Sequence, residues 1–107
     1  MDILDALASV ARYNGWNDVL HEIRNYLIQE VNNMKKTKVP YWNVPYPQFL
    51  NKYDVDLYPR VIWFIMVEMF GDCGCSPRFG WIEKNKSNDA IEFISQLCLK
   101  SDEPQED

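Results

Sequence analysis

Three prolines stand within eight positions in the middle of the chain, in the segment VPYWNVPYPQF. Pro40, Pro45 and Pro47 each lack the backbone N–H that a helix or a sheet ladder needs, so neither a helix nor a central strand can run through them. We therefore expect an extended or polyproline-like crossing segment here. Regular structure has to be built from the sequence on either side of it.

Apolar residues recur at helical spacing in three other parts of the chain. Residues 2–12 place Ile3, Leu4, Leu7, Val10 and Ala11 at such spacing, and Gly15 then reads as a helix stop. Residues 18–35 carry the longest stripe: Val19, Leu20, Ile23, Leu27, Val31 and Met34. A last segment, from about Ser87 to about Lys100, has an apolar face of Ala90, Ile91, Ile94, Leu97 and Cys98. Each pattern predicts an amphipathic helix.

The run VIWFIMVEMF, residues 61–70, is apolar nearly all round, so periodicity does not separate a buried helix from a buried strand. Its β-branched and aromatic residues favour a strand, whereas its length and Gly71 as a stop favour a helix. The helical interpretation predicts a mostly α fold, a small single-domain bundle of about four helices with a proline-rich extended segment. The alternative is an α+β fold with a short two-stranded element near 61–67 and 79–83.

The net charge of −5 comes mostly from the end of the chain. Residues 102–107 hold four acids and no base, and the rest of the sequence is nearly balanced. We expect residues 1–100 to form one globular domain and residues 101–107 an acidic disordered tail. The longest basic cluster, KKTK at 35–38, is too small to neutralise many phosphates, which argues against direct nucleic-acid binding.

Two features of the sequence favour a cytoplasmic location without membrane contact. The longest apolar run, 61–67, falls far short of the roughly 20 residues that a membrane-spanning helix needs. The first ten residues carry two acids where a secretory signal would be positively charged. The three cysteines, an odd number, favour reduced thiols over a disulfide framework.

The stretch GDCGCSPRFGW, residues 71–81, holds two of the three cysteines and three of the four glycines. Cys73 and Cys75, with Cys98 and His21, would supply the ligand number and type of a structural zinc site, but C-x-C is a tighter spacing than zinc knuckles use. A thioredoxin-type pair would need C-x-x-C at a helix N-terminus. We therefore expect no cofactor, and keep a metal- or redox-responsive domain using Cys73 and Cys75 as the alternative function.

Aromatic side chains gather on the proline-rich and glycine-rich segments, which rigid turns could display to a partner. The sequence has one histidine and no recognisable catalytic motif, so we expect a non-enzymatic module. Its expected role is to regulate or inhibit a larger protein or protein complex, with a mobile-element-encoded inhibitor of a nucleic-acid-handling defence complex as one specific form of that role. The oligomeric state is left open. The candidate partner-binding residues are Tyr41, Trp42, Tyr46, Asp72, Arg78, Phe79 and Trp81. The competing interpretation is that these rings cover a small core.

Overall fold

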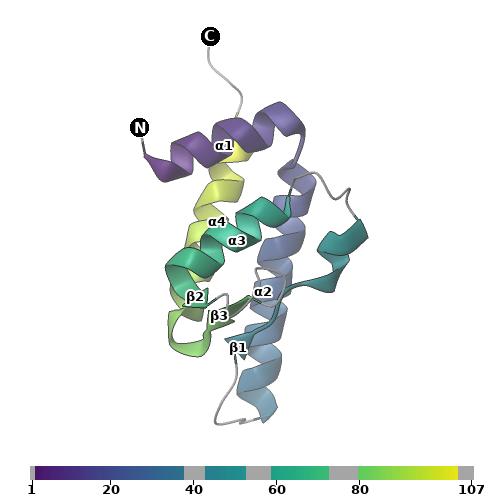
Figure 1. Cartoon of the computed structure of the whole chain (residues 1–107), viewed down its shortest axis with the longest axis vertical. Helices are drawn as coiled ribbons and strands as arrows, with labels where there is room; N and C mark the ends of the chain where they lie inside the picture. The colour runs from purple at the N-terminus through teal and green to yellow at the C-terminus, as the bar shows by residue number, and fades with distance from the viewer. Residues whose placement is uncertain (1, 38–42, 53–58, 73–79, 104–107) are drawn as a thin grey trace.

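Two antiparallel helices, α2 (Asn17–Thr37) and α4 (Ser87–Asp102), run along the long axis of the molecule (Figure 1). α1 (Ile3–Asn14) crosses the C-terminal part of α4, and α3 (Arg60–Phe70) packs on α4 farther down. This computed structural model describes residues 2–37, 43–52, 59–72 and 80–103. The mostly α class with four helices confirms the prediction from the sequence.

α1 begins and ends at residues that suit those positions. The Asp2 side chain accepts a hydrogen bond from the backbone N–H of Leu4 at 3.4 Å, which caps the first turn. Gly15 ends the helix in the left-handed conformation, with φ at +69°, and its N–H bonds to the last turn. The predicted stop at Gly15 is confirmed, and the chain turns there directly into α2.

The ambiguous run after Pro59 is a helix, so the alternative with a strand at 61–67 is wrong. Its buried residues, Ile62, Trp63, Met66 and Val67, follow a helical period that strand alternation could not produce. The strand half of that alternative is partly right, because Trp81–Glu83 forms β3. The partners of β3 are two-residue strands, too short for the sequence to predict.

β3 is the central strand of a three-stranded antiparallel sheet, in the order β1-β3-β2. β1 (Asn43–Val44) and β2 (Gly71–Asp72) are the edge strands. β1 ends before Pro45, so Pro45 and Pro47 lie outside the ladder, as their missing N–H groups require. Two short 3-10 helices, η1 (Gln48–Lys52) and η3 (Lys84–Lys86), connect the sheet to its neighbours.

An aromatic cluster holds the chain that follows β1 against the helices. Trp63 of α3 is fully buried, and its ring meets those of Tyr26 and Tyr46 edge to face, with centroids 6.1 and 6.5 Å apart. The Tyr26 hydroxyl donates to the Pro45 carbonyl at 2.7 Å. The proline-rich segment is therefore anchored by α2 and α3 where the structure describes it.

The C-terminal boundary of the folded unit differs from the expected one at residue 100. α4 continues to Asp102, and Ser101 is buried. Two residues assigned to the tail thus belong to the helix, because their contacts come from residues more than 80 positions away. Within the described ranges, no helix is both long enough and apolar enough to cross a membrane.

Gly71 provides a test of the close approach between β2 and β3. A Cβ built on Gly71 would lie 1.7 Å from the backbone carbonyl oxygen of Trp81, so the strands would have to separate. We expect Gly71→Ala to lower the free energy of unfolding by about 2–3 kcal/mol, measured by urea denaturation.

Gly15→Ala is the matched control, because a Cβ there meets nothing within 4 Å and only the positive φ resists it. That change should lower the free energy of unfolding by about 1 kcal/mol. A loss at Gly71 no larger than the loss at Gly15 would show that the two strands do not approach as closely as described.

Candidate functional site

Three of the seven candidate partner-binding residues lie in the described part of the chain: Tyr46, Asp72 and Trp81. The other four fall outside the described residues: Tyr41, Trp42, Arg78 and Phe79. Cys73 and Cys75, on which the metal or redox alternative depends, also fall outside them.

Asp72 and Trp81 are brought together by the pairing of β2 with β3. They are directly opposite each other in the antiparallel register, so both side chains lie on the same face of the sheet. Asn43 and Glu83 form the next pair on that face. Asp72 and Asn43 are exposed, and Trp81 and Glu83 are half-buried. We call these four residues the sheet outer face.

The opposite face of the sheet belongs to the core. Val44 and Ile82 are fully buried and pair with each other across β1 and β3. An amphipathic sheet of this kind leaves its second face for solvent or a partner. Trp81 consequently lies on the side of the sheet away from Val44 and Ile82, whereas Trp16 and Trp63 are core residues.

Tyr46 does not belong to this surface, and its expected role in partner binding is corrected by its burial. Its side chain is only 4% exposed and its ring stacks on Phe64 with centroids 6.3 Å apart. Its hydroxyl is hydrogen-bonded to the Asn51 side chain at 3.2 Å. For this residue the competing interpretation, a ring that covers the core, is the one observed.

The one histidine and the third cysteine lie near the same helical seam without forming a reactive pair. His21 Nε2 is 2.8 Å from Asp102 Oδ2 on the surface. Cys98 is 2% exposed, and burial, with a smaller contribution from Asp102, raises the pKa of its thiol to about 11. The thiol is therefore protonated at neutral pH and shielded from reagents or metals. Within the described ranges, no three His, Cys, Asp or Glu residues are grouped to hold a metal ion.

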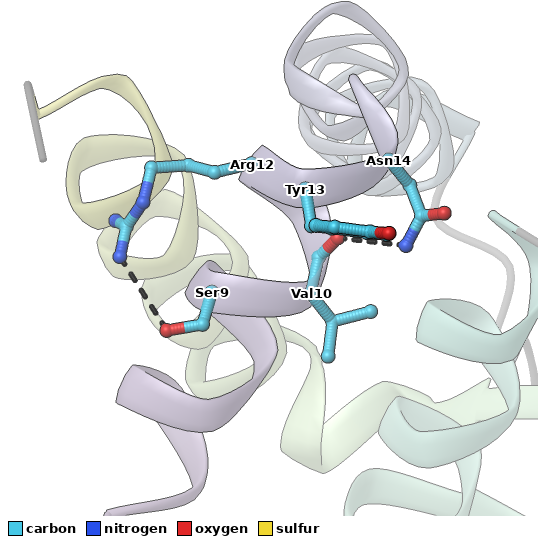
Figure 2. Close-up of a pocket in the computed structure, with 5 residues that line it drawn as sticks. All are labelled: Ser9, Val10, Arg12, Tyr13 and Asn14. Carbon is cyan, nitrogen blue, oxygen red and sulfur yellow. Dashed lines mark hydrogen bonds between the residues drawn. The ribbon is translucent and has the colours of Figure 1, made fainter.

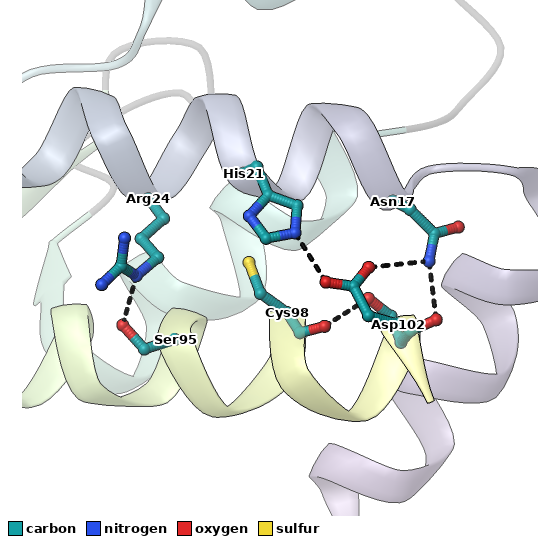
Figure 3. Close-up of polar contacts among 7 residues, drawn as sticks. Asn17, His21, Arg24, Ser95, Cys98 and Asp102 are labelled. Carbon is teal, nitrogen blue, oxygen red and sulfur yellow. Dashed lines mark hydrogen bonds and ion pairs between the residues drawn. The ribbon is translucent and has the colours of Figure 1, made fainter. Parts of the chain in front are cut away.

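Side chains of α2 cap the C-terminal end of α4 (Figure 3). Asn17 Nδ2 donates to the Ser101 carbonyl at 2.6 Å and to Asp102 Oδ1 at 3.3 Å. One turn farther along, His21 meets the second oxygen of Asp102, and Arg24 Nε donates to Ser95 Oγ at 2.7 Å. The last carbonyl groups of a helix have no partners within the helix, so the bond from Asn17 satisfies the Ser101 carbonyl, which would otherwise need water.

α1 binds the same end of α4 from the other side. Arg12 Nη1 donates to the Lys100 carbonyl at 2.6 Å, and Lys100 Nζ lies 2.8 Å from Asp5 Oδ1. The positive guanidinium also suits the negative end of the α4 dipole. No pattern in the sequence indicates these contacts, because each joins residues 88 or 95 positions apart.

An apolar stripe faces away from the core on α1. Ile3 and Val10 are 46% and 45% exposed, and Tyr13 is 91% exposed. Together with Ala6, which is half-buried, they recur at spacings of three and four residues along one side of the helix. We call these four residues the α1 outer face. Helical spacing groups Ile3 and Val10 with Leu7 and Ala11 in the sequence, but of these four only Leu7 and Ala11 are buried.

A hollow of about 410 Å³ opens beside the C-terminal half of α1. Its lining includes Ser9, Val10 and Tyr13, with Arg12 and Asn14 at its sides (Figure 2). Arg12 Nη2 is 3.5 Å from Ser9 Oγ, and Asn14 Nδ2 donates to the Val10 carbonyl at 2.9 Å. The hollow is therefore lined by both polar and apolar groups.

Comparison of this chain with protein-family models, with curated proteins and with solved structures finds no match.

Shortening the chain tests the cap on α4. A chain ending at Glu103 keeps every contact described above, so its free energy of unfolding should stay within about 0.5 kcal/mol of the full-length value. A chain ending at Lys100 loses the buried Ser101 and the bonds to Asn17 and His21, and should lose about 1–3 kcal/mol. Equal stabilities of the two shortened chains in urea denaturation would contradict the cap.

Asp102 also makes stability depend on pH. Its pKa lies below the ordinary value of 3.8, chiefly because of the hydrogen bond with His21; burial opposes this shift, and the bond with Asn17 adds to it. A carboxylate with a lowered pKa stabilises the folded state above pH 3.8, and this contribution is lost as the pH falls through the folded-state pKa. Asp102→Asn should remove it.

The expected loss is below about 1 kcal/mol, because the Asp102 side chain is nearly half exposed and solvent screens the pair. Thermal melts between pH 2 and 6 would show a shallower decline in stability toward acid for Asp102→Asn than for the unchanged chain. Leu99→Ala, at an exposed position of α4 that carries no titratable group, is the control and should leave the shape of the pH profile unchanged.

Proposed function

We propose that this chain is a small non-enzymatic protein-interaction module that regulates or inhibits a larger protein, and that it docks through the sheet outer face. The observation that carries the proposal is the register of β2 and β3, which places Asp72 beside Trp81 on the side of the sheet away from the core. Tryptophan is among the residue types most enriched in binding hot spots.

The chemistry of this pair indicates what kind of side chain it would bind. An indole face attracts a cation, and a neighbouring carboxylate can form an ion pair with the same group. A lysine or arginine of the partner could therefore stack on Trp81, where the nearby Asp72 carboxylate adds negative potential. β2 and β3 are joined by residues 73–80, so Arg78 and Phe79, two further candidates from the sequence, are close to this pair along the chain.

The thiol and imidazole chemistry in the described residues supports a non-enzymatic role. A nucleophilic cysteine needs a lowered pKa and access to substrate, and Cys98 has a raised pKa and almost no exposure. His21 is hydrogen-bonded to Asp102 at a helix end that this contact stabilises. Both groups thus have structural roles.

A cytoplasmic regulator of a nucleic-acid-handling complex, such as a defence complex inhibited by a mobile element, is the specific form of this function that we favour. Complexes of that kind expose many lysine and arginine side chains to bind phosphates. A surface that pairs a carboxylate with an indole is suited to bind one of them. The chain would then act on the protein and not on the nucleic acid.

Affinity capture from the native host tests this proposal. A tagged chain ending at Glu103 should retain one stoichiometric partner, identified by mass spectrometry. Trp81→Ala should weaken binding of that purified partner by roughly 30-fold or more, the effect of losing a hot-spot residue. Asp72→Arg should weaken it as well, through repulsion of the basic side chain.

Leu99→Ala is the control, since this residue is 68% exposed on α4, away from the sheet. It should leave the affinity within about twofold, as is usual for an isolated surface residue. A partner that binds the Trp81→Ala and Asp72→Arg variants as well as the unchanged chain would show that the sheet outer face is not the docking surface.

A further inference from the structure

Asn14 and Gly15, at the junction of α1 and α2, form the residue pair in which an asparagine most readily loses its side-chain amide. The backbone nitrogen of the following residue can attack the side-chain carbonyl carbon, because both groups belong to one chain and a five-membered ring results. A following glycine helps this attack, since it has no side chain to hinder the approach and its backbone is permissive. Of all the asparagines in the sequence, only Asn14 precedes a glycine.

The structure leaves this pair accessible. Both residues are exposed, and Asn14 is the last residue of α1. A Cβ built on Gly15 would meet nothing within 4 Å, so in the described part of the chain no neighbouring group crowds the site. The bond from the Gly15 N–H to the Arg12 carbonyl is 3.3 Å long, beyond the usual range for such bonds.

The closed last turn of α1 occupies both reacting groups. Asn14 Nδ2 donates to the Val10 carbonyl at 2.9 Å (Figure 2), and the Gly15 N–H faces the carbonyl groups of Ala11 and Arg12. The attack therefore needs this turn to open, and helix ends open at a small cost in free energy. Because opening is much faster than the chemical step, the rate depends on how much of the open form is present at equilibrium.

We propose that Asn14 is a site of spontaneous deamidation in the folded protein. The Gly15 backbone nitrogen forms a bond with Asn14 Cγ and gives up its proton. The bond from Cγ to Nδ2 breaks, and the amide leaves as ammonia. Water then opens the resulting succinimide at either carbonyl carbon, which gives aspartate or isoaspartate at position 14. Water is the only co-reactant.

The aspartate product would weaken the end of α1. Its carboxylate places a negative charge at the negative end of the helix dipole. It also has no N–H to donate to the Val10 carbonyl, which the Asn14 amide now satisfies. The residues three and four positions earlier, Ala11 and Val10, bring no positive charge beside it.

The isoaspartate product would change the turn into α2 more strongly. The main chain would then run through the former side chain and gain one carbon atom between Asn14 and Gly15. This turn is tightly specified, because Gly15 has φ at +69° and the Trp16 N–H bonds to the Ala11 carbonyl at 2.9 Å. Arg12, which ties α1 to α4, lies only two residues before the change. Deamidation would therefore loosen α1 from the bundle.

Peptide mapping of the full-length chain, kept folded at mildly alkaline pH, tests the proposal. Trypsin cuts after Arg12 and Arg24, so one peptide carries both Asn14 and Asn17. Asn17 is the internal control, because no glycine follows it and its amide donates to the Ser101 carbonyl at 2.6 Å. The mass increase of deamidation should appear at Asn14 roughly tenfold faster or more than at Asn17, since only Asn14 has the unhindered neighbour.

A second measurement follows the product. Anion-exchange chromatography should separate an acidic form that accumulates in the unchanged chain and not in the Asn14→Gln variant, because glutamine cannot form the same ring. The acidic form should unfold at a lower urea concentration than the unmodified chain. The inference does not depend on the proposed function, since Asn14 is not part of the sheet outer face.

Three results would overturn the proposal. The first is equal conversion at Asn14 and Asn17. The second is conversion of Asn14 in urea but not in the folded chain, which would show that the closed turn protects it. The third is an acidic form as resistant to urea as the unmodified chain, which would show that the change does not loosen α1.

Discussion

The cap on the C-terminal end of α4 determines how the N-terminal half of the chain is arranged. Asn17 and Arg12, from α2 and α1, donate to consecutive carbonyl groups at Ser101 and Lys100. These bonds hold α1 across α4 and hold the start of α2 alongside it. The apolar contacts of the core supply most of the stabilisation, but they are not directional, and the hydrogen bonds select one orientation of α1 among those that bury the same side chains. The outward position of Ile3, Val10 and Tyr13 follows from that orientation.

At the other end of the core, a small sheet covers apolar side chains that the helices do not cover. Val44 and Ile82 cover the core from one side, and Trp63 fills the space behind them and donates to the Gly80 carbonyl at 3.4 Å. The strands have two or three residues each, so the sheet depends on this support. Its other face carries the Asp72 and Trp81 pair on backbone that the core holds rigid, which is the situation that favours a binding surface.

The four helices could be predicted from the sequence because each has a stripe or a long apolar run and a suitable cap or stop. The short strands could not, since two or three residues are too few to show alternation. Only the pairing of β2 with β3 places Asp72 opposite Trp81, and no local pattern in the sequence predicts that pairing. The outward stripe of α1 could not be told from its buried side because apolar residues lie on both sides of this helix, and only the position of α4 decides which side is buried. The boundary after Lys100 was set too early for the same reason: Ser101 and Asp102 look like the start of an acidic tail until Asn17 and His21 are seen beside them.

The contacts of α4 have a consequence for the order in which the chain can fold during synthesis. Arg12 and Lys100 are 88 positions apart, and Asn17 and Ser101 are 84 apart. α4 is the main packing partner of α1 and α2. The apolar sides of α1 and α2 therefore cannot be buried against it until the sixteen residues of α4 have left the ribosome. A nascent chain that includes α3 but lacks α4 would still expose Leu20, Ile23 and Leu27, and would be a substrate for chaperones that bind apolar segments.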